Sequence, residues 1–211
     1  MYLSQLTLNG GNRLVLKELG NAHKLHQQIM HAFPDEQRDT SRNDWNILFR
    51  QEPDSEVVLV QSDLEPNWSN LPPQYLSDRV ELPLAVKPFN LSVEQVAAGR
   101  ILQFRLRANP SKRDNQTRKT IGLFRAADQL AWLERQAERC GFRLQGVDVI
   151  PSPNVFGQKG DKSAPIRIST ALYQGVLEVT DPEVLLNAVQ QGIGRGKSYG
   201  CGLLSIARLQ S

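Results

Sequence analysis

Strand and helix patterns follow one another twice along the chain in the same order: strand, helix, two strands, helix, strand. The clearest strand, ILQFRLRANP, begins at Ile101 and alternates, with Leu102, Phe104, Leu106 and Ala108 on one face and Gln103, Arg105 and Arg107 on the other. The clearest helix spans Phe124–Cys140, where apolar residues recur at helical spacing before Gly141. This order predicts an α+β protein made of two tandem ferredoxin-like (RRM-like) modules.

The first predicted module covers residues 1–90, and residues 91–99 link it to a second module at residues 100–211. In the first module we expect a helix over Asn21–Phe33, which Asn21 caps and Pro34 ends. Its strands are expected at Tyr2–Leu8, Trp45–Arg50, Val57–Gln61 and Leu84–Phe89, with at most a short helix between Pro66 and Leu82. The remaining strands of the second module are expected at Arg143–Ile150, Ile166–Leu172, Gln174–Val179 and Cys201–Ala207, with a helix that Asp181 caps, Pro182 opens and Gly192 ends.

Composition favours a folded protein of the cytoplasm. The 211 residues are 40% hydrophobic, which is enough to form a core. No apolar run approaches the roughly 18 residues of a membrane span, and the start MYLSQLTLNG lacks the features of a signal peptide. We therefore expect no membrane partner. Cys140 and Cys201 are expected to be reduced, without a disulfide or a shared metal.

Charge is distributed unevenly along the chain, although the net charge is only +3. Between Asp35 and Glu65 there are nine acidic residues and three arginines, whereas Arg100–Arg125 holds eight basic residues and one acid, Asp114. A concentrated basic stretch indicates a polyanionic partner bound at one place. A solvated charged surface explains the same pattern equally well.

A glycine-rich segment, QGIGRGKSYGCGLL, lies between the last predicted helix and the last strand. Its glycines are Gly192, Gly194, Gly196, Gly200 and Gly202. A P-loop needs glycine where Gln191 stands and must run from strand into helix, and a dinucleotide fingerprint has a different spacing. The segment can instead present backbone N–H groups, with Arg195 and Lys197 alongside, to an RNA phosphate backbone. A long turn before a terminal strand is an equal alternative.

Several motifs together resemble one known family. GIGRGKSYGCGLLSI resembles the C-terminal signature of the CRISPR repeat-cleaving endoribonucleases, and specifically of their CasE (Cse3) branch. The stretches MYLSQLTLN, NAHKLHQQIMHAFP, FRLRANPSKR, AWLERQA and YQGVLEVTDP agree with that branch in the same order along nearly the whole chain. The resemblance implies an enzyme that cuts a CRISPR repeat hairpin, leaves a 2′,3′-cyclic phosphate and a 5′-hydroxyl, and stays with the crRNA and the other subunits of Cascade.

The three histidines of the chain all lie in the predicted helix over Asn21–Phe33. At about 100° per residue, His23 and His26 lie about 60° apart and can serve one site, whereas His31 points elsewhere. Histidine can give or take a proton near neutral pH, as 2′-hydroxyl attack on RNA requires, although a surface role is common for single histidines. The family resemblance implies a catalytic role for His26. Members of the branch can have tyrosine where this chain has His23. His23 can take over proton transfer or positioning, or the second role can fall to a lysine or to the geometry of the RNA.

Other chemistries have little support in the sequence. The spacing of His23 and His26 is not that of a zinc helix, and no carboxylate cluster or Gly-x-Ser-x-Gly motif occurs. We expect neither a metal nor a small-molecule cofactor.

Basic residues of the second module are expected to hold the RNA stem through its phosphates and shape. The strand contributes Arg105 and Arg107, the mobile loop Ser111–Lys119 contributes Lys112, Arg113, Arg118 and Lys119, and the glycine-rich segment contributes Arg195 and Lys197. The predicted function is a metal-independent endoribonuclease for CRISPR repeat hairpins. The alternatives are a non-catalytic RNA-hairpin-binding subunit and, less well supported, a nucleotide-binding enzyme.

Overall fold

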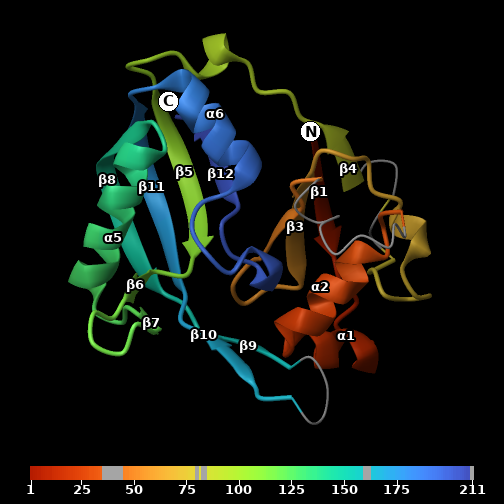
Figure 1. Cartoon of the computed structure of the whole chain (residues 1–211). Helices are drawn as coiled ribbons and strands as arrows, with labels where there is room; N and C mark the ends of the chain where they lie inside the picture. Colours follow the sequence, from red (N-terminus) through yellow and green to blue (C-terminus); the bar gives the residue numbers. More distant parts are fainter. Residues whose placement is uncertain (35–44, 79–80, 82–84, 159–162, 210–211) are drawn as a thin grey trace. The chain divides into compact units, whose positions relative to one another are not determined.

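The computed structural model describes residues 1–34, 45–78, 81, 85–158 and 163–209. The chain forms two compact units (Figure 1). The first contains Met1–Asn90, Val155–Arg167 and Ser198–Gly200, and the second contains Leu91–Asn154, Ile168–Lys197 and Cys201–Ser211. Two short segments from the second half of the sequence therefore belong to the first unit. The proposed module limits at residues 90 and 100 stay a prediction.

The first unit is built on a four-stranded antiparallel sheet. Its strands are β1 (Tyr2–Thr7), β2 (Leu48–Gln51), β3 (Val57–Ser62) and β4 (Val86–Pro88), in the order β2-β3-β1-β4. The helices α1 (Arg13–Leu19) and α2 (Ala22–Met30) connect β1 to β2, and a short 3-10 helix, η1 (Trp68–Asn70), follows β3. A two-stranded ribbon of β9 (Val155–Gly157) and β10 (Ile166–Ile168) is separate from this sheet.

The core of the first unit lies between α2 and the sheet. Leu25 and Ile29 of α2 are buried with Leu6, Val58 and Val60 of the strands. Ala32 and Phe33, just beyond the last turn of α2, are buried as well and continue its apolar stripe. Burial of each large apolar side chain stabilises the fold by about 1.5–3 kcal/mol.

A buried polar group joins α1 to the rest of this core. Glu18 of α1 is 5% exposed, and its carboxylate accepts hydrogen bonds from the Tyr75 hydroxyl (2.8 Å) and from Nε2 of Gln28 (3.3 Å). Burial, followed by the hydrogen bond to Glu18, raises the pKa of Tyr75 well above its usual range. The buried carboxylate of Glu18 thus has two hydrogen-bond donors, as a buried charged group needs.

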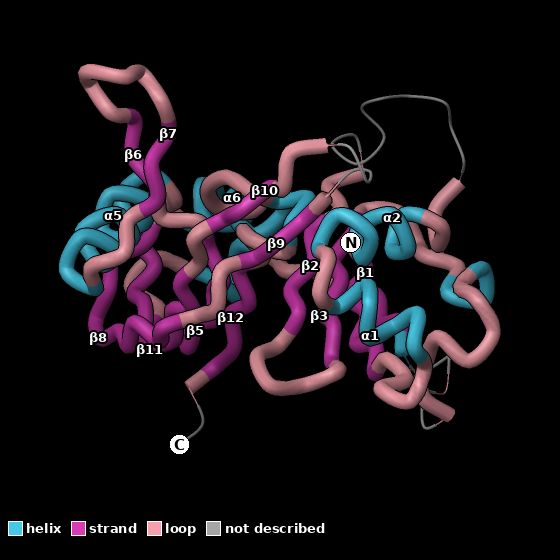
Figure 2. Tube along the Cα trace, turned by 90° about the horizontal axis from the view of Figure 1, so that it is seen from below, coloured by secondary structure: helices cyan, strands magenta, loops and turns pink. Residues whose placement is uncertain are grey.

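The second unit has the same strand order as the first. Its sheet contains β5 (Ile101–Ala108), β8 (Phe142–Pro151), β11 (Ala171–Val179) and β12 (Leu204–Arg208), in the antiparallel order β12-β5-β11-β8. The helices α5 (Ala126–Arg139) and α6 (Pro182–Gln191) lie on one side of the sheet (Figure 2). A 3-10 helix, η2 (Val93–Val96), precedes β5. Both units have the ferredoxin-like strand order, and the fold is α+β with two tandem ferredoxin-like units, as predicted.

Local signals explain where the helices of the second unit begin and end. Asp181 caps α6 by accepting a hydrogen bond from the backbone N–H of Val184 (3.1 Å), Pro182 opens the helix, and Gly192 is its C-cap. Helix α5 ends at Arg139, and Gly141 follows with φ +74. A Cβ at Gly141 would lie 2.4 Å from the carbonyl oxygen of Asp181, so only glycine fits.

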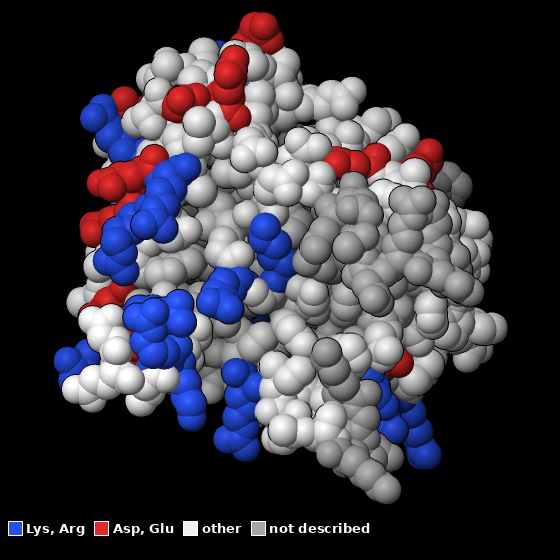
Figure 3. Space-filling model, in the orientation of Figure 1, with Lys and Arg blue, Asp and Glu red and all other residues white. Residues whose placement is uncertain are grey.

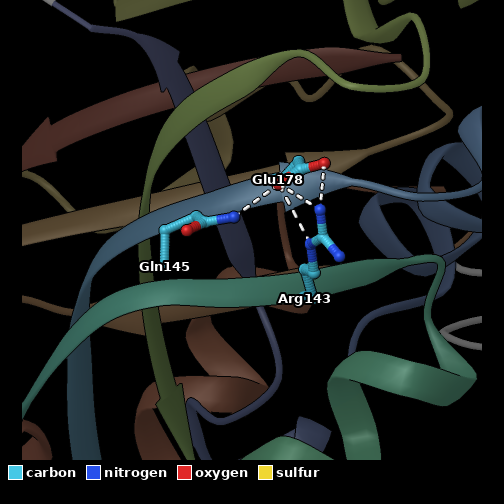
Figure 4. Close-up of polar contacts among 3 residues, drawn as sticks. All are labelled: Arg143, Gln145 and Glu178. Atoms are coloured by element: carbon cyan, nitrogen blue, oxygen red, sulfur yellow. Dashed lines mark hydrogen bonds and ion pairs between the residues drawn. The ribbon is translucent and has the colours of Figure 1, made fainter.

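A β-bulge in β8 brings two side chains to one carboxylate. The register of β8 and β11 shifts between Val176 and Leu177. Beside the shift, Nη2 of Arg143 lies 2.7 Å from Oε1 of Glu178, and Gln145 also donates to this carboxylate (Figure 4). The Arg143 side chain is 64% exposed, so the ion pair contributes at most about 1 kcal/mol.

The structure differs from the predicted elements at four places. Helix α1 was not predicted, the predicted break at Tyr173 is wrong because β11 runs through it, and Ile166–Ile168 pairs with β9 outside the main sheets. The loop predicted over Ser111–Lys119 is largely a hairpin of β6 (Ser111–Arg113) and β7 (Thr120–Gly122). Part of the acidic stretch, residues 35–44, and Leu84 of a predicted strand lie outside the described residues. No helix in the described part of the chain is long and apolar enough to cross a membrane.

Tyr75→Phe tests the buried polar group. The substitution removes one of the hydrogen bonds to the Glu18 carboxylate, so we expect the free energy of unfolding to fall by about 1.5–3 kcal/mol in urea denaturation. Tyr173→Phe is the matched control, because that hydroxyl donates to the backbone carbonyl of Gln129 (3.1 Å), and its loss should cost only about 0.5–1.5 kcal/mol. If both variants lost the same free energy of unfolding, the hydrogen bond to the Glu18 carboxylate would be no stronger than one to a backbone carbonyl, contrary to this prediction.

Candidate functional site

The histidine pair lies in the first half of α2. Asn21 caps the helix, because its Oδ1 accepts hydrogen bonds from the backbone N–H groups of His23 (3.2 Å) and Lys24 (3.4 Å). His23 and His26 are both half-buried, whereas His31 is exposed and forms the C-cap. The structure thus separates His31 from the other two histidines, in line with the helical spacing.

The start of α2 is tied to the β9–β10 ribbon. The Asn21 side chain accepts a hydrogen bond from the backbone N–H of Gln158 (3.1 Å) and donates one to its carbonyl oxygen (3.4 Å). A Cβ built on Gly157 would lie 3.2 Å from Cε1 of Tyr199 and 3.4 Å from the backbone nitrogen of His23. The Tyr199 ring and the first turn of α2 therefore meet at Gly157, where glycine gives the space.

The ring of His26 lies on a buried aromatic side chain. His26 and Phe49 of β2 have nearly parallel rings, with an interplanar angle of 10° and centroids 6.1 Å apart. Phe49 is 1% exposed, and its Cε2 would lie 3.2 Å from a Cβ at Gly200. Phe49 is therefore a fixed, buried neighbour of the imidazole, and Gly200 allows the chain to pass close to Phe49.

Sequence reasoning found the histidine helix but missed Tyr199. This residue belongs to the 3-10 helix η3 (Lys197–Tyr199), and Ser198–Gly200 is part of the first unit although the flanking glycine-rich residues belong to the second. No pattern along the chain relates position 199 to position 23. Among the described residues, no three His, Cys, Asp or Glu side chains form a group that could hold a metal ion.

The hairpin β6–β7 carries four exposed cations: Lys112, Arg113, Arg118 and Lys119. It projects from the rest of the second unit in Figure 2, and Lys and Arg side chains gather at this end of the unit in Figure 3. The single acid of this basic stretch, Asp114, accepts hydrogen bonds from the backbone N–H and the hydroxyl of Thr117, both 2.7 Å. These bonds lower the pKa of Asp114 and fix the turn, so the acid has a structural role within the hairpin.

The strand β5 confirms the predicted apolar face and corrects the polar one. Arg105 is half-buried and donates to Oε1 of Gln174 (3.3 Å) on the neighbouring strand. Arg107, which was expected to reach the RNA from the polar face, is 8% exposed, and its Nη2 donates to the carbonyl oxygen of Pro153 (3.2 Å). Arg107 also lies near the buried Cys201, where burial raises the thiol pKa to about 12 and the guanidinium partly opposes that shift.

All five glycines of the glycine-rich segment have positive φ. The values run from +75 at Gly192 to +96 at Gly202, a region that other residues enter only with strain. Several of the N–H groups expected to face a phosphate are used within the protein, since Gly192, Ile193, Cys201 and Gly202 donate to backbone carbonyls. The segment is thus more tightly folded than predicted.

The two cations of this segment differ in their surroundings. Arg195 is exposed, and its Nη1 donates to Oγ1 of Thr120 on β7 (3.2 Å), which places its guanidinium at the basic hairpin. Lys197 is half-buried in η3. Arg195 therefore extends the cationic surface of the hairpin.

The fold and these side chains define a class: proteins with two ferredoxin-like units, one with a histidine pair and the other with a cationic hairpin. The chain belongs to the family described as CRISPR associated protein, whose family model matches residues 1–208.

Two characterised relatives extend over nearly the whole chain. The CRISPR-associated endoribonuclease Cse3 of Thermus thermophilus is 35% identical over 98% of this chain and 100% of its own length. The CRISPR system Cascade subunit CasE of Escherichia coli is 34% identical over 99% of this chain and 100% of its own. A solved structure of Thermus thermophilus Cse3, bound to an RNA representing a pre-cleavage complex, matches with a TM-score of 0.81 and 34% identity over 98% of each chain.

Gly200→Ala tests the packing beneath His26. Gly99→Ala is a matched control, because both glycines have φ +79 and nothing lies within 4 Å of a Cβ at Gly99. We expect backbone strain of about 1–2 kcal/mol in both variants, and a further loss of about 1–3 kcal/mol for Gly200→Ala from the contact with Phe49. Urea denaturation measures the loss, and NMR shifts of the His26 ring report the displacement. If the two variants lost the same free energy of unfolding and the NMR signals of the His26 ring did not shift, Phe49 would not transmit the substitution at Gly200 to His26.

Proposed function

We propose that this chain is a metal-independent endoribonuclease that cleaves CRISPR repeat hairpins in precursor crRNA and retains its product within Cascade. The observation that carries the proposal is the histidine pair on α2, in a chain that matches an endoribonuclease over its full length. The TM-score of 0.81 to the pre-cleavage complex of Cse3 supports the same reaction. Such a protein works in the cytoplasm, where precursor crRNA is present.

The reaction needs two proton transfers at one phosphate. A base removes the proton of the 2′-hydroxyl, the 2′-oxygen attacks the adjacent phosphorus, and the bond from phosphorus to the 5′-oxygen breaks. An acid then protonates the leaving 5′-oxygen, which gives a 2′,3′-cyclic phosphate and a 5′-hydroxyl.

His26 carries out one of these proton transfers. Its Nδ1 is buried, so the transfer uses Nε2. Phe49 restricts the orientation of the imidazole before the RNA binds. Less entropy is therefore lost when the imidazole is aligned with the proton that it transfers. His23 lies one turn earlier on the helix and either transfers the other proton or positions the phosphate.

The basic hairpin holds the RNA stem. Lys112, Arg113, Arg118, Lys119 and Arg195 form a cationic surface on the second unit, and Arg105 and Lys197 add charge from β5 and η3. Phosphate contacts of this kind fix the position of the stem and depend little on its sequence. The five positive-φ glycines keep Arg195 at the hairpin and Tyr199 beside α2.

Cleavage of a labelled repeat hairpin in EDTA tests the catalytic proposal. We expect His26→Ala to reduce the single-turnover rate by about 10²–10⁴-fold without weakening binding, because general acid or base catalysis contributes factors of this size. A hairpin with a 2′-deoxy group at the scissile position should bind and stay intact. A reduced single-turnover rate of His23→Ala would show that His23 also contributes to catalysis.

His31→Ala is the matched control for this experiment, since His31 is on the same helix but exposed at its C-cap, and its rate should equal that of the native protein. Cleavage that requires a divalent cation would contradict the mechanism. Tight binding without cleavage by the native protein would identify a non-catalytic RNA-hairpin-binding subunit instead.

The salt dependence of binding tests the hairpin. A variant with both Lys112→Ala and Lys119→Ala should bind more weakly and reduce the slope of log affinity against log salt by about 1.5, because each lost phosphate contact removes about 0.7–0.9. Fluorescence anisotropy gives the slope when the affinity is measured at several salt concentrations, roughly between 50 and 200 mM, where the salt dependence of RNA binding is large. Arg143→Ala removes a cation that Glu178 already pairs (Figure 4), and should leave the slope unchanged.

A further inference from the structure

We infer that Phe124 forms a base-stacking site at the foot of the basic hairpin, where one nucleobase of the bound RNA lies on its ring. Phe124 follows β7 directly after Leu123 and precedes Arg125, the N-cap of α5. Its side chain is 73% exposed, the highest value among the exposed large hydrophobic side chains of the described residues. The inference rests on the proposed function, because it concerns the same RNA.

The exposed ring is attached to a fixed backbone. The adjacent Leu123 is 6% exposed, its N–H donates to the carbonyl oxygen of Pro110 (2.9 Å), and its own carbonyl accepts from Nε2 of the buried Gln129 (2.9 Å). A Cβ on Gly122 would lie 3.6 Å from Cζ of Phe124, so the ring leans toward the end of β7. The backbone that carries the ring is therefore held by hydrogen bonds on its N-terminal side and is not part of a loose loop.

The segments on either side of Phe124 carry cations. The hairpin contributes four exposed Lys and Arg side chains, and Arg195 lies at the same strand through its bond to Thr120. Arg125 is the N-cap of α5 and makes no side-chain capping bond. A cation at a helix N-terminus opposes the helix dipole, and arginine is a poor cap, so this residue costs stability at a place where an anion would be favoured.

An exposed aromatic ring between segments that carry cations matches the two parts of a nucleotide. The base can stack on the ring while neighbouring phosphates contact the Lys and Arg side chains. Bases within a double-stranded stem are covered by their neighbours, so a side chain can stack only on the terminal pair or on an unpaired base next to it. The site therefore recognises the end of the stem or a nucleotide flanking it, with little preference for the type of base.

Binding of an uncleavable 2′-deoxy repeat hairpin to Phe124 variants of the whole chain tests the inference. We expect Phe124→Ala to weaken binding about tenfold, as loss of one base–aromatic stack does, and Phe124→Trp to retain the affinity. Phe124→Leu should resemble Phe124→Ala, because leucine keeps apolar area but has no aromatic face. Ile121→Ala is the control, since Ile121 is a 39% exposed apolar residue on the same hairpin and should bind as the native protein does.

A second measurement locates the base. With 2-aminopurine at either end of the stem or at a flanking position, one position should show fluorescence quenching with the native protein and with Phe124→Trp, but not with Phe124→Ala. Native affinity in Phe124→Ala would overturn the inference, as would equal weakening by Ile121→Ala. Unchanged RNA binding with impaired association of other Cascade subunits would assign the ring to a protein interface and also overturn it. Failure of the native protein to bind the hairpin would instead reject the proposed function.

Discussion

Five glycines with positive φ allow the segment between α6 and β12 to follow a path that other residues would resist. At about 1–2 kcal/mol for each residue in this region, the same path without glycine would consume most of the stability of a typical domain. The path supplies Tyr199 beside the histidine helix, Gly200 against Phe49, and Arg195 at the basic hairpin. One stretch of backbone thus contributes to both groups of candidate functional residues. Both groups of residues therefore depend on the conformation of this segment.

Much of the fold follows from local patterns in the sequence. The caps and apolar spacing of α5 and α6 predict their limits closely, and the alternation of β5 predicts its buried face. Helix α1 was missed because its inner face contains Glu18, whose carboxylate is hydrogen-bonded by Gln28 of the next helix and by Tyr75, 57 residues away. Hydrophobic periodicity has no signal for a buried carboxylate whose hydrogen-bond donors come from other elements.

The candidate site was less predictable, because it too depends on contacts between different parts of the chain. Helical spacing relates His23 to His26 and separates His31, but it does not show which residues lie beside them. Asn21 was expected to cap α2, and its second set of hydrogen bonds, to Gln158, depends on the tertiary structure. For Arg107, strand alternation indicated the face of the sheet correctly but not the depth of burial, because the Pro153 carbonyl is brought to it by a different part of the chain.

The β6–β7 hairpin is held largely by bonds within itself. Asp114 and Thr117 fix the turn, Arg113 donates to the carbonyl of Arg118, and the four cations are exposed. Substitutions among these cations therefore leave the hydrophobic core untouched. The charge and shape of the hairpin can therefore change one residue at a time while the two ferredoxin-like units stay constant. Under the proposed function, this is the part of the molecule that can evolve together with a changing repeat RNA.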